Sequence, residues 1–167
     1  MSTGQFLDQI LFFVFFAIVI FAALSDLSRF RIPNAVSLAL VLLFPLHVLA
    51  SPVHVDWVGS LAVAGVVFLA GFALFASGLV GGGDVKLLAA TALWACQALV
   101  LPQLAVMAIA GGVLSVVILL LQFARRFLAG GLVGLLVPDL NAAAPKVPYG
   151  LAIAAGAGYA GLKVMAG

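Results

Sequence analysis

The chain has 167 residues, of which 66% are hydrophobic and only 7% are charged, and its mean hydropathy is +1.39. A soluble domain of this length could not solvate such a surface, so the composition predicts an integral membrane protein. The formal net charge of +2 is too small to indicate a nucleic-acid partner. The apolar runs are continuous and do not alternate with polar residues, which favours helices over a β-barrel.

The apolar runs predict one membrane-embedded domain over residues 1–167, an all-α polytopic bundle of about six transmembrane helices. In chain order, the spans are expected near residues 10–25, 35–50, 57–80, 85–100, 104–124 and 148–167. Leu101 and Pro102 are expected to separate the fourth span from the fifth, because proline interrupts a helix. The first run has no basic segment before it, so we interpret it as a retained span and not as a cleaved signal.

The segment between the last two expected spans differs from the others in length. Residues 127–137 are apolar, but they are too few and too rich in glycine to span the bilayer reliably. Interfacial, re-entrant and spanning interpretations of this segment stay open. Asp139, which follows it in the sequence VPDLN, is expected in a turn.

The basic residues collect on one side of the expected bundle. The first, third and fifth loops share a side and hold Arg29, Arg31, Lys86, Arg125, Arg126 and Lys146. The opposite side holds only Lys163. The positive-inside rule therefore predicts that the odd-numbered loops are cytoplasmic and that both termini lie outside. Asp26 and Asp84 are then expected together at the cytoplasmic face.

Most of the remaining polar and aromatic residues are expected to have structural roles. Asp8 and Asp56 are expected at the surface or at an interface, and the single cysteine, Cys96, is expected to pack as a small apolar side chain. His47 and His54, near the outer face, are not expected to form a metal site. Three aromatic side chains near expected span ends would suit an interfacial belt: Trp57, Trp94 and Tyr149.

Asp26 ends the first expected span, and Asp84 begins the fourth. Both have a structural interpretation. Asp84 could cap its helix after Gly81, Gly82 and Gly83 end the preceding helix in positive-φ conformations, and Asp26 could pair with Arg29. A chemical interpretation is also open, because two carboxylates held together share a proton. Such a pair can activate a water molecule for attack on a carbonyl, or it can carry protons or cations in a transporter.

Three stretches of the chain resemble the type IV prepilin peptidases, membrane aspartic proteases of the GxGD class. Residues 81–84 read GGGD and match the class signature, which Lys86 continues. Residues 31–34 read RIPN and follow Asp26 as in that family, and residues 147–150 read VPYG and match a third family stretch. The matches occur in the family's order, and the resemblance covers nearly the whole chain.

The resemblance implies a peptidase that cleaves the leader from prepilin-like or pseudopilin-like proteins at the cytoplasmic face of the bacterial inner membrane. Asp26 and Asp84 correspond to the catalytic pair, and no cofactor or metal is implied. Residues expected to bind substrate or shape the site are Gly81, Gly82, Gly83, Lys86, Pro148, Tyr149 and Gly150. Lys86 could tune Asp84 or meet the substrate, or it could only anchor the helix end at the bilayer surface. Ile32, Pro33 and Asn34 are expected to form a structural turn in which Asn34 caps the second helix.

Larger members of that family carry an extra domain with paired cysteines that methylates the new pilin terminus. The single Cys96 argues against such an N-methyltransferase domain here and against S-adenosylmethionine as a cofactor. The chain therefore resembles the short, protease-only branch that serves tight-adherence (Flp) pili, or a similar minimal peptidase. The sequence leaves open the identity of the prepilin, the residues around the cleaved bond and the oligomeric state. A small transporter that uses the two acids remains the alternative function.

Overall fold

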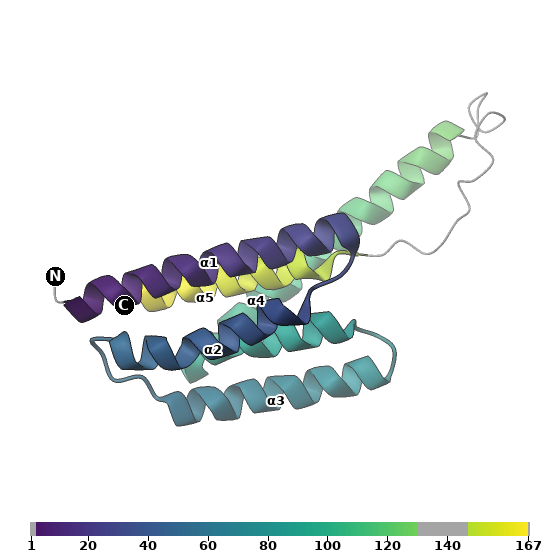
Figure 1. The fold of residues 1–167 in the computed structure, drawn as a ribbon. Helices are drawn as coiled ribbons and strands as arrows, with labels where there is room; N and C mark the ends of the chain where they lie inside the picture. Colours follow the sequence, from purple (N-terminus) through teal and green to yellow (C-terminus); the bar gives the residue numbers. More distant parts are fainter. Residues whose placement is uncertain (1–2, 130–146, 167) are drawn as a thin grey trace.

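The computed structural model of the protein describes residues 3–129 and 147–166, and the regular structure within them is helical. Five helices follow in the order α1 (Thr3–Arg29), α2 (Asn34–Ala50), α3 (Trp57–Ala76), α4 (Gly82–Ala129) and α5 (Tyr149–Ala166) (Figure 1). Helix α5 packs against α1 and α4, and α2 packs against the same two helices. Helix α3 lies on the outside of the bundle, against α4.

Three of these helices are long and apolar enough to cross a membrane. Their candidate spans are Gly4–Arg29, Trp57–Ala76 and Gly82–Ala124, and Asn34–Ala50 is a shorter apolar helix. Large apolar side chains cover their outward faces, among them Leu69 and Phe72 on α3. Such a surface suits lipid and not water, which agrees with the composition. The expected count of six spans stays a prediction.

Helix α4 contains a sharp turn at Cys96, whose backbone has φ 55° and ψ −177°. The expected break at Leu101 and Pro102 is therefore wrong: Pro102 lies inside the helix, and the chain turns before it. A positive φ is unfavourable for a residue with a Cβ, so contacts across the turn must hold it. One such contact joins the two halves of α4, because Gln103 Nε2 donates to Thr91 Oγ1 at 2.8 Å in the buried interior.

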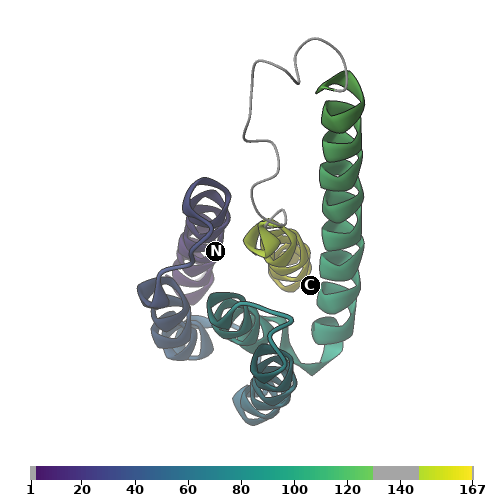
Figure 2. The ribbon, with the colours of Figure 1, turned by 90° about the vertical axis from the view of Figure 1, so that its right-hand side faces the viewer.

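After this turn, the second half of α4 (residues 97–129) runs along the other side of α5. Figure 2 shows α5 enclosed between α1 and this long segment. Gly156 of α5 permits the close packing, since a Cβ there would lie 2.5 Å from the Gln103 carbonyl oxygen. Residues 130–137, Asp139 and Lys146, for which the sequence made predictions, lie outside the described residues.

An aromatic cluster joins α1, α2 and the first half of α4. Trp94 is 1% exposed, and its indole stacks on His47 with ring centroids 5.1 Å apart. The indole Nε1 donates to the Leu40 carbonyl oxygen at 3.0 Å. The expected place of Trp94 in an interfacial belt is therefore wrong, because its ring is buried and its N–H is satisfied inside the protein. Trp57 and Tyr149 are exposed.

His47 also contacts the acid nearest the N-terminus. Its Nδ1 lies 2.5 Å from Asp8 Oδ1, and the imidazole is 2% exposed. Asp8 thus lies half-buried at the interface between α1 and α2, which is one of the two positions expected for it. Asp56 is exposed as expected, but it also caps α3, where its Oδ1 accepts the Gly59 N–H at 2.9 Å.

At the end of α3, the glycine with a positive φ is a different one from those predicted. The helix ends at Ala76, and Gly78, with φ +73°, is the glycine that adopts the left-handed conformation. The positive φ expected at Gly81, Gly82 and Gly83 is therefore wrong, because the helix has already ended before them.

Candidate active site

One end of the bundle gathers the residues of all three sequence motifs. The end of α1, the turn to α2 and the beginnings of α4 and α5 lie there together (Figure 1). Asp26 lies in the last turn of α1, where its carbonyl oxygen accepts the Phe30 N–H at 2.8 Å. Its side chain is 6% exposed and points toward α5.

The Asp26 carboxylate is bound at the start of α5. Its Oδ2 accepts a hydrogen bond from the Gly150 backbone N–H at 2.7 Å. The first N–H groups of a helix have no partner within the helix and carry a partial positive charge, so a carboxylate is stabilised there. Gly150 permits the approach, because a Cβ at this position would lie 2.8 Å from Asp26 Cβ. Pro148, at the start of the same element, is buried, and the Tyr149 ring is exposed beside Gly111 of α4.

Asp84 lies in the first turn of α4, two residues after the helix begins at Gly82. Its carboxylate folds back and accepts a hydrogen bond from the Gly81 backbone. A Cβ on Gly81 would meet this carboxylate, at 2.8 Å from Oδ2. Asp84 is therefore not the N-cap residue that the structural interpretation expects. Its carboxylate instead reaches back to the backbone of Gly81, as the third helical residue does in a capping box.

The two acids approach each other across the bundle. The carboxylates of Asp26 and Asp84 are close enough to interact electrostatically. Gly83 brings their segments together, since a Cβ on it would lie 3.3 Å from Ile32 Cβ and 3.4 Å from the Ile32 carbonyl oxygen. The GGGD stretch therefore packs directly on the turn that follows Asp26.

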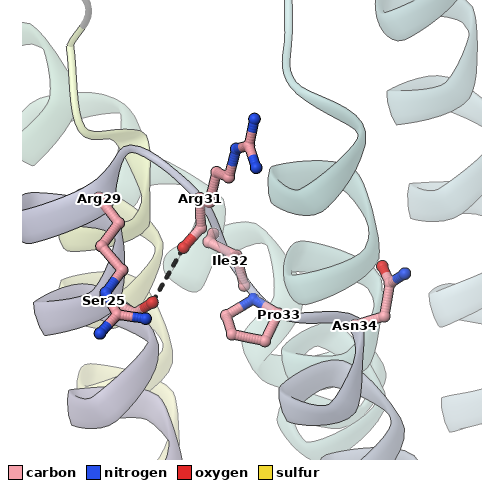
Figure 3. Close-up of a pocket in the computed structure, with 6 residues that line it drawn as sticks. All are labelled: Ser25, Arg29, Arg31, Ile32, Pro33 and Asn34. Carbon is pink, nitrogen blue, oxygen red and sulfur yellow. Dashed lines mark hydrogen bonds between the residues drawn. The ribbon is translucent and has the colours of Figure 1, made fainter.

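The turn between α1 and α2 is held by polar contacts. Ser25 Oγ donates to the Arg31 carbonyl oxygen at 2.9 Å (Figure 3). Pro33 is the residue before α2, and no side chain caps that helix. The expected capping by Asn34 is wrong, because Asn34 is already helical and its Oδ1 accepts a hydrogen bond from Lys86 Nζ at 3.0 Å. No role is expected for Ser25 from the sequence, where its position directly before Asp26 is the signal that could have pointed to it.

A polar pocket of about 410 Å³ opens at this turn. Its lining residues come from the end of α1 and the start of α2: Ser25, Arg29, Arg31, Ile32, Pro33 and Asn34. In Figure 3 the Arg29 side chain lies beside Ser25, whereas Arg31 extends away from it. The alternative in which Arg29 pairs with Asp26 is not observed among the described side chains, where Asp26 bonds to Gly150 instead.

Comparison with protein families matches residues 13–135 to the type IV leader peptidase family. The chain belongs to this family. The matched residues include Asp26 and Asp84 and end before the Pro148–Gly150 stretch. The same comparisons find no matching curated protein and no matching solved structure.

The described site contains two carboxylates, those of Asp26 and Asp84. Within residues 3–129 and 147–166, no three side chains of histidine, cysteine, aspartate or glutamate gather as a metal site would require. His47 belongs instead to the aromatic cluster at the other end of α1. Two interacting carboxylates beside a polar pocket are suited to proton transfer to and from a bound water molecule.

Proposed function

We propose that this leader peptidase hydrolyses a peptide bond with Asp26 and Asp84 as its catalytic pair, and that its substrates are prepilin-like membrane proteins. The observation that carries the proposal is the packing of the GGGD stretch, which bears Asp84, on the turn that follows Asp26. The contacts of Gly83 with Ile32 and of Gly150 with Asp26 support it, because they hold both acids at one end of the bundle.

In the proposed reaction, one carboxylate removes a proton from water while the water oxygen attacks the carbonyl carbon of the substrate. The other acid donates its proton to the carbonyl oxygen. The tetrahedral intermediate then releases the amine, which takes a proton from the pair, while one hydroxyl of the intermediate returns its proton to the pair and becomes the carbonyl of the new carboxyl end. Asp26 keeps Oδ2 on the Gly150 N–H, so Oδ1 is the oxygen available to water.

The proposed site lies at the cytoplasmic face of the bacterial inner membrane, with both termini outside. Arg29, Arg31 and Lys86 are at the same end of the bundle as the two acids, which supports this orientation under the positive-inside rule. The substrate we propose is a prepilin of the tight-adherence (Flp) type, because the chain resembles the short peptidases that serve those pili.

The alternative of a small transporter gains no support. Transporters that use intramembrane acids place them near the bilayer midplane on interrupted helices. Asp26 lies in the last turn of α1 and Asp84 in the first turn of α4, and the family is one of peptidases.

The test is cleavage of a purified Flp prepilin by the full chain in lipid vesicles. We expect Asp26→Asn and Asp84→Asn each to lower kcat by roughly 10²–10⁴-fold, the usual contribution of a general acid or base. Asp56→Asn is the matched control, since asparagine also caps a helix and Asp56 lies at the other end of α3. Undiminished cleavage by Asp26→Asn or by Asp84→Asn would rule out the proposed catalytic pair.

A further inference from the structure

A second hollow of the molecule is an apolar groove of about 600 Å³ between α1, the second half of α4 and α5. Figure 2 shows the three helices that form it, with α5 between the other two. Its lining residues are all apolar: Ile20, Ala23, Leu24, Ala110, Val113, Leu114, Val117, Leu151, Ala152, Ala154 and Ala155. The α4 wall covers about two helical turns, or roughly 10 Å along the axis.

The groove reaches the candidate active site at one end. Ala23 and Leu24 line it and lie within one turn of Asp26 on α1. Leu151 and Ala152 also line it, and they directly follow Gly150, whose N–H holds the Asp26 carboxylate. A chain that leaves this end of the groove therefore emerges beside Asp26.

The surroundings of Asp26 change in polarity at this point. The lining of the groove offers no polar side chain, whereas the pocket at the turn from α1 to α2 is lined in part by Ser25, Arg29, Arg31 and Asn34. An apolar helix fits the first surface without losing hydrogen bonds, and a polar, extended segment fits the second. On α1, Asp26 lies between Leu24, which lines the groove, and Arg29, which lines the pocket.

We infer that the groove seats the apolar helix of the membrane protein substrate and so presents the bond at its polar end to Asp26 and Asp84. This inference rests on the proposed function. A peptide is favoured as the occupant over lipid because groove residues flank Asp26 on α1 and Gly150 on α5, and only a peptide helix continues into a backbone that can be cut there. Lipid, a second copy of this chain and the chain's own residues 130–146 are the other occupants that the test must separate.

The first experiment places a photoreactive benzoylphenylalanine at Val113 in the Asp84→Asn variant of the full chain. The variant is reconstituted in lipid vesicles with a purified Flp prepilin that retains its leader. We expect a cross-link to the apolar segment of the prepilin on illumination. The same probe at Leu69, which is 68% exposed on α3 and outside the groove, should give none. A Val113 cross-link only to lipid, to a second copy or to residues 130–146 would overturn the inference.

The second experiment fills the groove in the otherwise unchanged enzyme. Ala155 lines it and is exposed, so Ala155→Phe adds volume to the groove without entering the packed core. We expect KM for the prepilin to rise about tenfold with kcat nearly unchanged, since substrate binding is weakened and the reacting groups are untouched. Ala70→Phe makes the same change at an exposed position of α3 and should leave KM unchanged.

The two readouts separate this inference from the proposed function. If the unaltered enzyme cleaves the prepilin but Ala155→Phe leaves KM unchanged, the groove does not seat the substrate and the peptidase proposal stands. If the unaltered enzyme does not cleave, the peptidase proposal fails for this prepilin, and the Val113 cross-link still reports whether the groove holds it. Absence of both cleavage and cross-link rejects both statements.

Discussion

The backbone N–H of Gly150 donates a hydrogen bond of 2.7 Å to Asp26 Oδ2, although 124 positions separate the two residues. This bond orients the Asp26 carboxylate from a neighbouring helix and couples the start of α5 to the end of α1. It also gives a physical reason for glycine in the VPYG stretch, because a larger residue would occupy the space of the carboxylate.

The first prediction concerns the space at Gly150. In Gly150→Ala, the new Cβ would lie 2.8 Å from Asp26 Cβ and 2.9 Å from Oδ2, so the carboxylate must move. A displacement of about 1 Å of a catalytic group can lower the rate by roughly 10²-fold. We therefore expect a loss of prepilin cleavage of that size, measured as kcat, in a protein that still folds.

The control is Gly158→Ala in the same helix, where a Cβ would meet nothing within 4 Å. Alanine is the better helix former by about 0.5–1 kcal/mol, so this variant should unfold at the same or a higher temperature and cleave normally. Equal activity in the two variants would contradict a positioning role for Gly150.

The second prediction concerns Asp8 and His47, which join α1 to α2. Asp8→Asn removes the charge that faces the buried imidazole, so we expect the free energy of unfolding to fall by about 1–3 kcal/mol. Cleavage by the folded protein should not change, since Asp8 lies roughly 27 Å from Asp26 along α1. Denaturant unfolding in detergent and the cleavage rate measure the two effects separately.

A double-mutant cycle with His47→Gln checks that this loss comes from the pair. The two substitutions together should cost clearly less than the sum of the single losses, because each removes the same interaction. Additive losses would show that Asp8 and His47 act independently on stability.

The third prediction concerns the turn at Cys96. Thr91→Val leaves the Gln103 amide without its acceptor in the core, which should cost about 1–3 kcal/mol of unfolding free energy. Gln103 Oε1 already has no partner among the described groups, so the double variant Thr91→Val, Gln103→Met removes both polar ends. We expect the double variant to be more stable than Thr91→Val alone, as measured by thermal unfolding. A double variant that unfolds at a lower temperature than Thr91→Val would mean that the bond from Gln103 to Thr91 does not hold the turn at Cys96.

The fourth prediction concerns Lys86, whose Nζ donates to Asn34 Oδ1 at 3.0 Å on an exposed surface. If the lysine also meets the substrate, as the resemblance to the prepilin peptidases implies, Lys86→Met should lower kcat/KM for prepilin cleavage more than Asn34→Ala does. Both variants lose the same exposed hydrogen bond, so their stabilities should differ little. Equal effects of the two variants on kcat/KM would show that Lys86 only links α4 to α2.

Much of this protein follows from its sequence alone. Continuous apolar runs predict an all-helical membrane protein, because hydropathy and helix length act over neighbouring residues. The start of α2 near Asn34 and that of α5 after Pro148 were predicted within one residue, because proline marks these boundaries. The GGGD and RIPN stretches led to the family that residues 13–135 match.

Only the tertiary structure decided how these segments meet. Local rules placed the break of α4 at Pro102, whereas the contact of Gln103 with Thr91 holds it at Cys96. The burial of Trp94 and the contact of Asp8 with His47 depend on three helices that are distant in sequence. The same is true of the bond from Gly150 to Asp26. A pattern of neighbouring residues carries no information about such partners, since they are chosen by packing across the bundle.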